Sequence, residues 1–415
     1  MGFVAQAAYI GRRGTHLQRA YDINQIDAGP ILNDFLNMQY NLNVATNCKP
    51  DGVSQRNTGV DPITGVPQPP CSGGRRIGIV NYGLANTGPN TLLAPGFVNS
   101  DTTVTDLQQN AAGNFAGRVE QSTLALKLRP NQQFGVITYI DAGGDSYYHA
   151  AQFTLRKRFE KGYLLGAAYT FGKSIDNQSV DPVGASSGGG LTTTNSRTPT
   201  NIRNWHGERS RSDFDRTHVF TASGVWELPV GKGKWLDGGN GFVNTLIGGW
   251  TLNGIYTFMT GEPFSVTSGI RTANFSHVSR ADVIKPVEAK LQEKAGVAGP
   301  VIFANASAFA FPAPGSDGAG RNIFNSPRYW NVDLSIVKSF QLTERFKLDF
   351  RTEMFNAFNH TNFDNPRDAS TGSPSITSTV FGQTCCAAVA PPTTQTIIQT
   401  GEAARVIQFA LKLKF

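Results

Sequence analysis

Hydrophobic and polar side chains alternate one by one along several segments of the chain, and the last segment shows this most clearly. Every second side chain between residues 405 and 415 is apolar, and the side chains between them are mostly polar. The apolar positions are Ile407, Phe409, Leu411, Leu413 and Phe415. Because successive side chains of a β-strand point to opposite faces, this period of two predicts a strand with one apolar and one largely polar face.

Seven further segments show the same alternation and predict strands of similar length. They are residues 3–9, 151–159, 163–171, 220–228, 250–258, 330–336 and 345–354. Most approach the ~9–11 residues that a tilted strand needs to cross a bilayer, and aromatic residues tend to lie at their ends. Residues 121–128 and 134–140 are further strand candidates, which would raise the number of strands from eight to ten.

Charged residues occupy the polar faces of two of the predicted strands. They are Arg156, Arg158, Lys347, Asp349, Arg351 and Glu353. Removing unpaired ions from water costs several kcal/mol each, so these residues do not suit a dry protein core. We expect them to face a water-filled barrel lumen, where they could pair along and across the strands. They are candidates for contact with a substrate or a plug, although generic lumen polarity is the explanation that we favour.

The connections between the predicted strands alternate in length. Residues 160–162 and 341–344 are tight turns, and residues 229–246 form a middling, glycine-rich connection. The long polar connections are about 11–147, 174–216, 262–328 and 359–403. Outer-membrane barrels have short periplasmic turns and long extracellular loops, and counting back from a periplasmic C-terminus places every long connection outside. The pattern predicts an all-β fold, an antiparallel transmembrane β-barrel in the outer membrane.

Composition argues against two other classes of protein. Only 39% of the residues are hydrophobic, the mean hydropathy is −0.25, and no apolar run approaches the ~18 residues of a spanning helix. This argues against a membrane protein built from helices. The net charge of +7 comes from basic residues that are scattered, whereas a nucleic-acid-binding protein usually gathers them into one stripe. We therefore expect no nucleic-acid partner.

Several motifs suggest chemistry, but each lacks a part that the chemistry needs. The triple glycine at residues 188–190 is not followed by the Lys-Ser/Thr of a phosphate loop. Ser223 and Ser265 lack the glycine-flanked elbow of serine hydrolases, and the six histidines show no regular ligand spacing. The polar group before the strand at 220–228 fits ion pairs at a strand entry better than a metal site: Asp213, Asp215, Arg216 and His218. We expect no enzyme, no catalytic residue, no cofactor and no metal.

The four cysteines do not form a metal-binding or redox motif. Cys48 and Cys71 flank a polar stretch rich in proline and glycine, and in an oxidising compartment they could form a disulfide or remain loop thiols. Adjacent cysteines rarely pair because the geometry of such a disulfide is strained, so Cys385 and Cys386 stay unassigned.

Several segments together resemble one family of outer-membrane proteins. They are AYIGRRGTHL at 8–17, DINQ at 22–25, YYHAAQ at 147–152, KRF at 157–159 with Gly162, YTFGKSID at 169–176, SDFDRTH at 212–218, FRTEMFNAFNH at 350–360 and Asn362-Phe363. In this order and with these spacings, the chain resembles the Oar-like TonB-dependent transporters, which have an N-terminal carboxypeptidase-regulatory-like domain, a plug and a large barrel. The apolar stripe that ends in Phe415 resembles the C-terminal signal for the barrel-assembly machinery.

The resemblance implies that residues 1–415 are the C-terminal part of a plugged barrel of about 22 strands. The first residues lack a secretory signal, so we expect the signal peptide, the plug, the TonB-contacting segment and the early strands to be missing from this chain. The implied partners are outer-membrane lipid, these missing parts, TonB acting through them, and the assembly machinery. The implied function is TonB-dependent uptake of a ligand that the sequence does not identify.

Two alternatives of other classes stay open. Eight to ten strands could close by themselves into a small outer-membrane channel or structural barrel. A soluble, carbohydrate-binding β-sandwich would also show alternating strands, but it would bury Phe409, Leu411 and Phe415 in a protein core.

Overall fold

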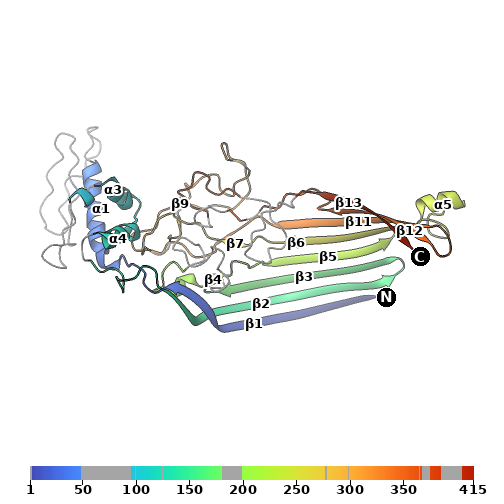
Figure 1. The fold of residues 1–415 in the computed structure, drawn as a ribbon, viewed down its shortest axis with the longest axis horizontal. Helices are drawn as coiled ribbons and strands as arrows, with labels where there is room; N and C mark the ends of the chain where they lie inside the picture. The colour runs from blue at the N-terminus through green and yellow to red at the C-terminus, as the bar shows by residue number, and fades with distance from the viewer. Residues whose placement is uncertain are drawn as a thin grey trace.

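Eight long strands form one antiparallel sheet in the computed structural model of the protein (Figure 1). The structure describes residues 2–47, 95–98, 100–122, 126–179, 199–275, 278–297, 299–363, 365–366, 374–384 and 404–415. In sheet order the long strands are β1 (Phe3–Asp22), β2 (Thr138–Glu160), β3 (Tyr163–Asp176), β5 (His218–Glu227), β6 (Trp250–Met259), β11 (Tyr329–Gln341), β12 (Lys347–Phe355) and β13 (Val406–Lys414). Each long strand pairs with the next one along the chain, which confirms the predicted all-β antiparallel fold. Among the described residues, β1 and β13 are the two edges of the sheet and do not pair with each other.

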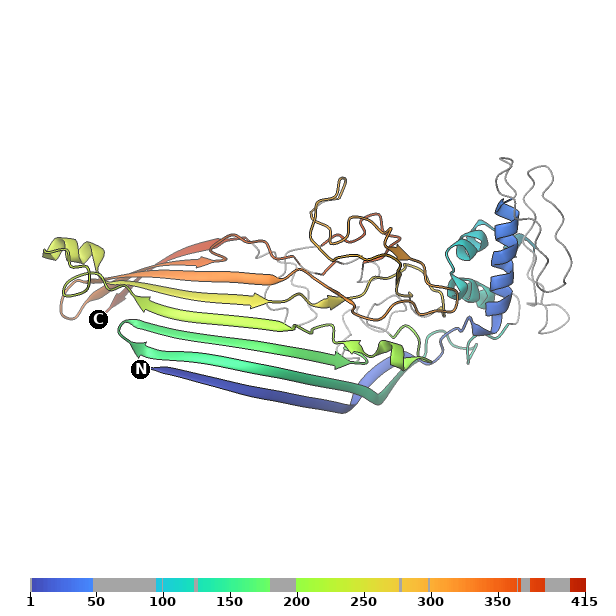
Figure 2. The ribbon, with the colours of Figure 1, turned by 180° about the vertical axis from the view of Figure 1, so that it is seen from behind.

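The two ends of the sheet differ sharply, as Figures 1 and 2 show. Both chain termini lie at one end, together with the connections 161–162, 228–249 and 342–346; we call it the turn end. The connections at the opposite end, which we call the loop end, are residues 23–137, 177–217, 260–328 and 356–405. At the turn end, Lys161 and Gly162 join β2 to β3 with positive φ angles of 55° and 84°. Two consecutive positive φ angles are the geometry of the tightest hairpin turns, in which glycine is favoured.

Cross-strand pairing sorts the side chains of the sheet onto two faces. Leu413 lies opposite Leu348, and Leu411 lies opposite Phe350, so the apolar positions of neighbouring strands share one face. We call this the apolar face and the opposite one the polar face. Phe409 and Leu411 are each 68% exposed on the apolar face. This exposure contradicts the β-sandwich alternative, which requires protein to bury them.

The first two strands are longer than the sequence predicted. β1 has 20 residues and β2 has 23, so the first long connection runs from 23 to 137 rather than from 11 to 147. The alternation of apolar and polar residues fades toward the loop end, but backbone pairing continues as far as Asp22 and Thr138, with register shifts between Gly14 and Arg19. The two strands still pair there because their hydrogen bonds join backbone N–H and C=O groups, which do not depend on the alternation of side chains.

The two additional strand candidates are wrong as independent strands. Gln121 ends the helix α4 (Ala112–Gln121), and residues 126–128 have no regular structure. Residues 138–140 are the beginning of β2 rather than a strand of their own. The structure therefore has eight long strands in its described part, not ten.

Two compact apolar clusters lie at the loop end. The first, which we call the helical cluster, joins η1 (Gly29–Ile31), α1 (Leu32–Asn47), α2 (Pro95–Val98), α3 (Asp101–Gln108) and α4. In its centre, the rings of Phe35 and Phe115 are both fully buried, with centroids 5.7 Å apart. The Ser100 side chain accepts a hydrogen bond from Thr103 N and caps α3, as expected of serine before a helix.

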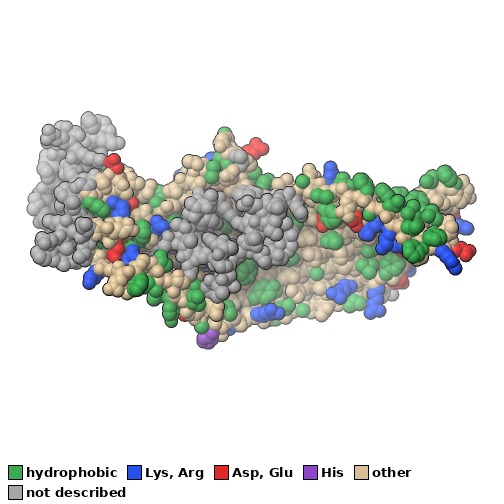
Figure 3. All heavy atoms as spheres, in the orientation of Figure 1, with side chains coloured by type: hydrophobic (Ala, Val, Ile, Leu, Met, Phe, Trp, Pro, Cys, Tyr) green, Lys and Arg blue, Asp and Glu red, His purple; other side chains and the backbone are tan. Residues whose placement is uncertain are grey.

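The second cluster, the phenylalanine cluster, is formed largely by residues of the β6–β11 connection, including residues of its short strands. Its rings are Phe264, Phe303, Phe309, Phe324 and Phe381. The short strands are β7 (Pro263–Phe264), β8 (Asp282–Val283), β9 (Phe309–Ala310) and β10 (Phe324–Asn325). The buried apolar clusters of the described chain thus lie in its loops, whereas the sheet presents its large apolar side chains outward, as Figure 3 shows around the turn end.

None of the helices described is both long enough and apolar enough to cross a membrane.

Candidate functional site

The charged residues of the predicted lumen lie on the polar face of the sheet. Arg156 and Arg158 are exposed on β2. On β12, Arg351 pairs with Glu353 at 2.8 Å, and Gln408 Nε2 of β13 donates to Glu353 Oε2 at 2.8 Å. These contacts run along one strand and across to its neighbour, which is how charges on a wet face are satisfied.

Asp349 is the one buried member of this set. Its carboxylate accepts a hydrogen bond from Ser339 Oγ at 2.6 Å and pairs with Lys414 Nζ at 2.5 Å. Lys347 lies opposite Lys414 on the neighbouring strand, so two lysines flank the same acidic group. This cluster ties β11, β12 and β13 together near the turn end. Contact of these residues with a substrate or a plug stays a prediction.

A second set of charges lies where the loops meet the strand ends, and Arg321 is at its centre. The Arg321 side chain is only 6% exposed and pairs with Asp176 at the end of β3. It also pairs with Asp213 at 3.2 Å, and its Nε donates to the backbone oxygen of Glu208 at 3.0 Å. Burial alone would lower the pKa of Arg321, but Asp213 and Asp176 outweigh burial and raise it. This arginine therefore remains charged while it joins the β6–β11 connection to the β3–β5 connection.

Arg280 makes a parallel junction between the same two connections. Its Nη1 pairs with Glu208 Oε1 at 3.1 Å and donates to Thr200 Oγ1 at 2.7 Å. Its Nε donates to the backbone oxygen of Ala319 at 2.6 Å. The Arg280 and Glu208 side chains are 7% and 5% exposed. We call Arg280, Arg321 and their acidic partners Glu208, Asp213 and Asp176 the arginine clamp.

The polar group before β5 takes part in this junction through ion pairs and hydrogen bonds. Asp215 pairs with Arg211 at 2.7 Å and accepts a hydrogen bond from Ser174 N at 2.7 Å. Arg216 pairs with Glu262 at 2.8 Å. The described residues contain no cluster of three or more His, Cys, Asp or Glu side chains that could hold a metal ion.

His218 lies on the apolar face, where Tyr169 Oη and His218 Nδ1 are 2.7 Å apart. This pair, like the ion pairs above, agrees with the structural interpretation of residues 212–218 as the loop–barrel boundary. The strand pairing also places Phe171 directly opposite His218.

A further junction fixes the loop-end parts of the two longest strands, beyond the segments in which apolar and polar residues alternate. Arg19 of β1 pairs with Asp141 of β2 at 2.6 Å, and Tyr21 Oη donates to Asp141 at 2.9 Å. The Arg19 guanidinium lies 3.8 Å from the ring centroid of Trp205 in η3 (Trp205–Glu208). The hydrogen bond from Arg19 lowers the pKa of Asp141 to about 2.

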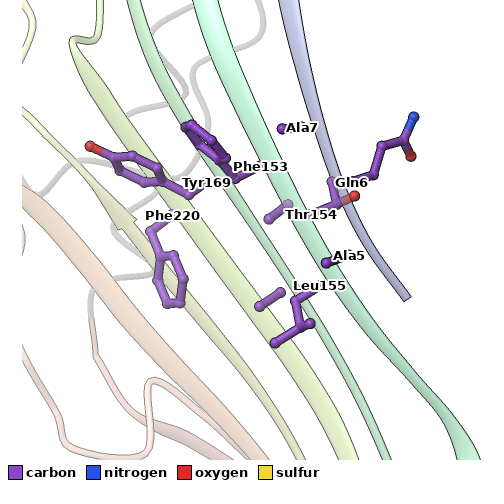
Figure 4. A pocket seen from close by; sticks show the side chains of 10 residues that line it. Ala5, Gln6, Ala7, Phe153, Thr154, Leu155, Tyr169 and Phe220 are labelled. Atoms are coloured by element: carbon purple, nitrogen blue, oxygen red, sulfur yellow. The ribbon is translucent and has the colours of Figure 1, made fainter. Parts of the chain in front are cut away.

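A hollow of about 470 Å³ lies on the apolar face, not at the loop end (Figure 4). Small side chains such as Ala5, Ala7 and Ala167 form its floor, and Phe153 and Tyr169 stand beside them. Because the hollow opens on the same face as the exposed aromatic side chains, it is part of the outer surface of the wall rather than a ligand site in the lumen.

Analysis of the sequence did not identify Arg280 or Arg321. Both lie in a long connection without periodicity, and their acidic partners are 72 to 145 residues away along the chain. An arginine among loop residues carries no local signal that it is buried. Several predictions fall outside the described residues: the pairing of Cys48 with Cys71, the positions of Cys385 and Cys386, and the triple glycine at 188–190.

Comparison with curated proteins gives no match, and comparison with solved structures gives none. The model of one protein family, described as outer membrane beta barrel domain, matches residues 1–408. This match agrees with the exposed apolar face and the antiparallel sheet of long strands, and it indicates location in the outer membrane. The chain belongs to the outer membrane beta barrel domain family.

Proposed function

We propose that this chain is the wall and the outer cap of an outer-membrane receptor that takes up a ligand with energy supplied through TonB. The observation that carries the proposal is the arginine clamp, which fixes two long loops to each other and to the end of β3. The segments that resemble Oar-like TonB-dependent transporters support the TonB-dependent part.

The loop end has the properties of a preformed binding surface. Burying an arginine costs several kcal/mol unless a carboxylate and further hydrogen bonds compensate for the lost water. Arg280 and Arg321 have both kinds of partner, so the loops are held in one arrangement. Binding residues are commonly carried by loops on a rigid scaffold, and a preorganised loop loses less entropy when a ligand binds.

The edges of the sheet support completion of the barrel by other strands. β1 and β13 each have one side that no described strand pairs with. Lipid cannot satisfy backbone hydrogen-bonding groups, so such edges must be paired in a membrane. We propose that further strands and a plug complete the wall, that TonB acts through those parts, and that the assembly machinery binds the C-terminal strand with its 95% exposed Phe415. The proposal assigns no catalysed reaction and no cofactor to the chain.

Genetics in the native bacterium tests uptake even when the ligand is unidentified. One strain lacks this gene, a second lacks TonB, and both grow on panels of peptides, oligosaccharides and chelated metals as limiting nutrients. We expect at least one nutrient on which both strains fail and on which the double deletion is no worse than either single deletion. A nutrient lost only with this gene and retained without TonB would contradict the proposal and favour a passive channel. No loss on any panel would favour a structural role.

The second candidate is a small autonomous barrel, which the number of strands favours because about eight strands can close into a barrel. A long bismaleimide, which crosslinks two cysteines, tests whether the sheet closes. The protein has its native cysteines replaced by serine and carries two new ones, Gln6→Cys on β1 and Gln408→Cys on β13. The control joins Glu353 on β12 to the same Gln408, because their side chains are in contact at 2.8 Å. We expect the control to form the crosslink and the Gln6 pair not to form it. A crosslink in both variants would support the small barrel.

A further inference from the structure

The connection between β5 and β6 at the turn end contains a short helix that lies against the apolar face. This helix is α5 (Gly241–Ile247), and we call residues 228–249 the α5 turn. Lys338 of β11 lies opposite Trp250 and Phe350 and therefore projects from the apolar face. Its Nζ donates to the backbone oxygens of Thr245 at 2.6 Å and Leu246 at 3.1 Å, and the Lys338 residue is only 3% exposed.

Trp250 makes a second contact of the same kind. Its Nε1 donates to the backbone oxygen of Leu246 at 3.2 Å. Because Lys338 and Trp250 both project from the apolar face, the C-terminal end of α5 is held on the membrane side of the wall rather than over the lumen. Cations near a helix C-terminus are favourable because the last carbonyl groups there lack partners in the helix.

The α5 turn exposes four large apolar side chains close together in the sequence. Trp235 is 87% exposed, Phe242 is 76% exposed, and Leu236 and Leu246 are each 52% exposed. Exposed apolar surface is unfavourable in water, and large apolar patches mark sites of contact with lipid or protein. Figure 3 shows hydrophobic side chains gathered around this end of the molecule.

Hydrogen bonds within the α5 turn hold its shape without a hydrophobic core. The Asp237 carboxylate accepts from Gly233 N at 2.9 Å, from Gly239 N at 3.0 Å and from Asn244 Nδ2 at 2.7 Å. Asn240 Oδ1 accepts from Val243 N at 2.8 Å and caps α5. The exposed apolar side chains are therefore presented by an ordered turn, not by a fraying one.

Three features favour lipid over protein as the occupant of this surface. The α5 turn is attached to the apolar face, which already meets the membrane. Tryptophan prefers the boundary between headgroups and acyl chains. Lys232 and Lys234 are exposed in the same turn, where they could meet lipid phosphates.

We propose that the α5 turn is a membrane foot: it inserts Trp235, Leu236, Phe242 and Leu246 into the boundary region of the lipid leaflet at the turn end. In the outer membrane, short barrel turns face the periplasm, so this is the periplasmic leaflet. The foot fixes the height and tilt of the wall in the bilayer, and it does so independently of any transported ligand.

Fluorescence quenching in vesicles of phosphatidylethanolamine and phosphatidylglycerol tests the foot. The whole protein, with its native cysteines replaced by serine, carries the environment-sensitive dye NBD on a single cysteine at Phe242. The matched control is Glu344, an exposed residue of the β11–β12 turn at the same end, and the lipid-embedded reference is Leu411. Lipids with a nitroxide on the acyl chain quench dye in the membrane, and iodide quenches dye in water.

We expect several-fold stronger nitroxide quenching at Phe242 than at Glu344, close to that at Leu411, and weak iodide quenching at Phe242. Strong iodide quenching with no nitroxide effect at Phe242 would overturn the proposal, because the turn would then be in water. Shielding from both quenchers would also overturn it and would indicate a second copy of the chain, which a disulfide crosslink between two copies of unlabelled Phe242→Cys protein would detect. Because Phe242 is exposed, Phe242→Cys leaves the packing of the wall unchanged, and normal migration of the folded protein verifies this.

Discussion

The loop end and the sheet place their apolar side chains in opposite environments. At the loop end, fully buried rings such as Phe303 and Phe115 pack against protein, and buried arginines have protein partners. In the sheet, rings of the same kind, such as Phe409, point outward and are exposed. The loops that connect the strands therefore contain compact hydrophobic cores, whereas the described strands of the sheet have no such core of their own. Water covers the loops, so they need a core, whereas lipid covers the strands.

The largest expected effect comes from removing the central charge of the arginine clamp. Arg321→Met leaves the buried Asp176 and the partly exposed Asp213 without their shared cation, and loss of one partner of a buried ion pair typically costs about 3–5 kcal/mol. We expect faster trypsin cleavage in residues 199–217 and 260–328 of the membrane-embedded protein, while the strands stay protected. The control Arg156→Met removes an exposed charge of the polar face and should change cleavage little. Equal cleavage of both variants would mean that the clamp does not hold the loops.

A matched pair of phenylalanines tests the comparison directly. Phe303 is 1% exposed and lies 5.2 Å from Phe309 and 5.6 Å from Phe381 between ring centroids. Phe303→Ala should cost the loop end about 3–5 kcal/mol, because it removes buried contacts and leaves a cavity. Phe409→Ala should leave loop-end stability unchanged, because its ring contacts lipid. Hydrogen exchange of the loop amides, measured for both variants in lipid vesicles, distinguishes these outcomes. An equal loss of amide protection in the two variants would contradict the difference between the two regions.

A smaller effect is expected where α4 approaches the segment 271–275. A Cβ atom on Gly113 would lie 2.2 Å from the backbone oxygen of Asn274. Gly113→Ala should therefore push α4 away and destabilise the helical cluster by about 1–3 kcal/mol, as overpacking usually does. Gly135→Ala is the control, because a Cβ there meets nothing within 4 Å. Thermal unfolding followed by circular dichroism at 222 nm reports mainly on these helices, and an unchanged midpoint for Gly113→Ala would contradict the close packing.

The smallest effect concerns acid. The pKa of Asp141 is lowered to about 2, first by its hydrogen bond from Arg19. A carboxylate with a lowered pKa stabilises the fold fully above its ordinary pKa of about 3.8, and this contribution is lost as the pH falls from there through about 2. Pepsin cleavage of β1 and β2 near Arg19 is compared at each pH with that of Asp141→Asn, because the variant carries the same pH dependence of pepsin itself. We expect the wild-type protein to be cleaved more slowly than Asp141→Asn at pH 4 and at a more similar rate at pH 2. A ratio of the two rates that does not change with pH would rule out this role.

Local pattern was enough to find the strands because their chemistry repeats every second residue. The stripe from Ile407 to Phe415 and the charges on β12 are placed on their faces as predicted, since backbone geometry alone alternates the side chains. The positions at which the strands end could not be predicted as well from the sequence. β1 and β2 continue for more than ten residues after the alternation fades, because backbone pairing tolerates Arg12, Arg13 and Gly14 once two strands are already aligned.

Sequence pattern was sufficient for the antiparallel wall with its apolar face, for the order of long and short connections, and for the resemblance to a transporter family. The folded chain was needed to reveal that the loops contain their own cores, that Arg280 and Arg321 join two of these loops, and that Lys338 holds α5 against the membrane face. The physical reason is distance along the chain. A period of two can be recognised from neighbouring residues alone. Asp176 and Arg321 are 145 residues apart, and they can pair only after the sheet has brought the strand ends together.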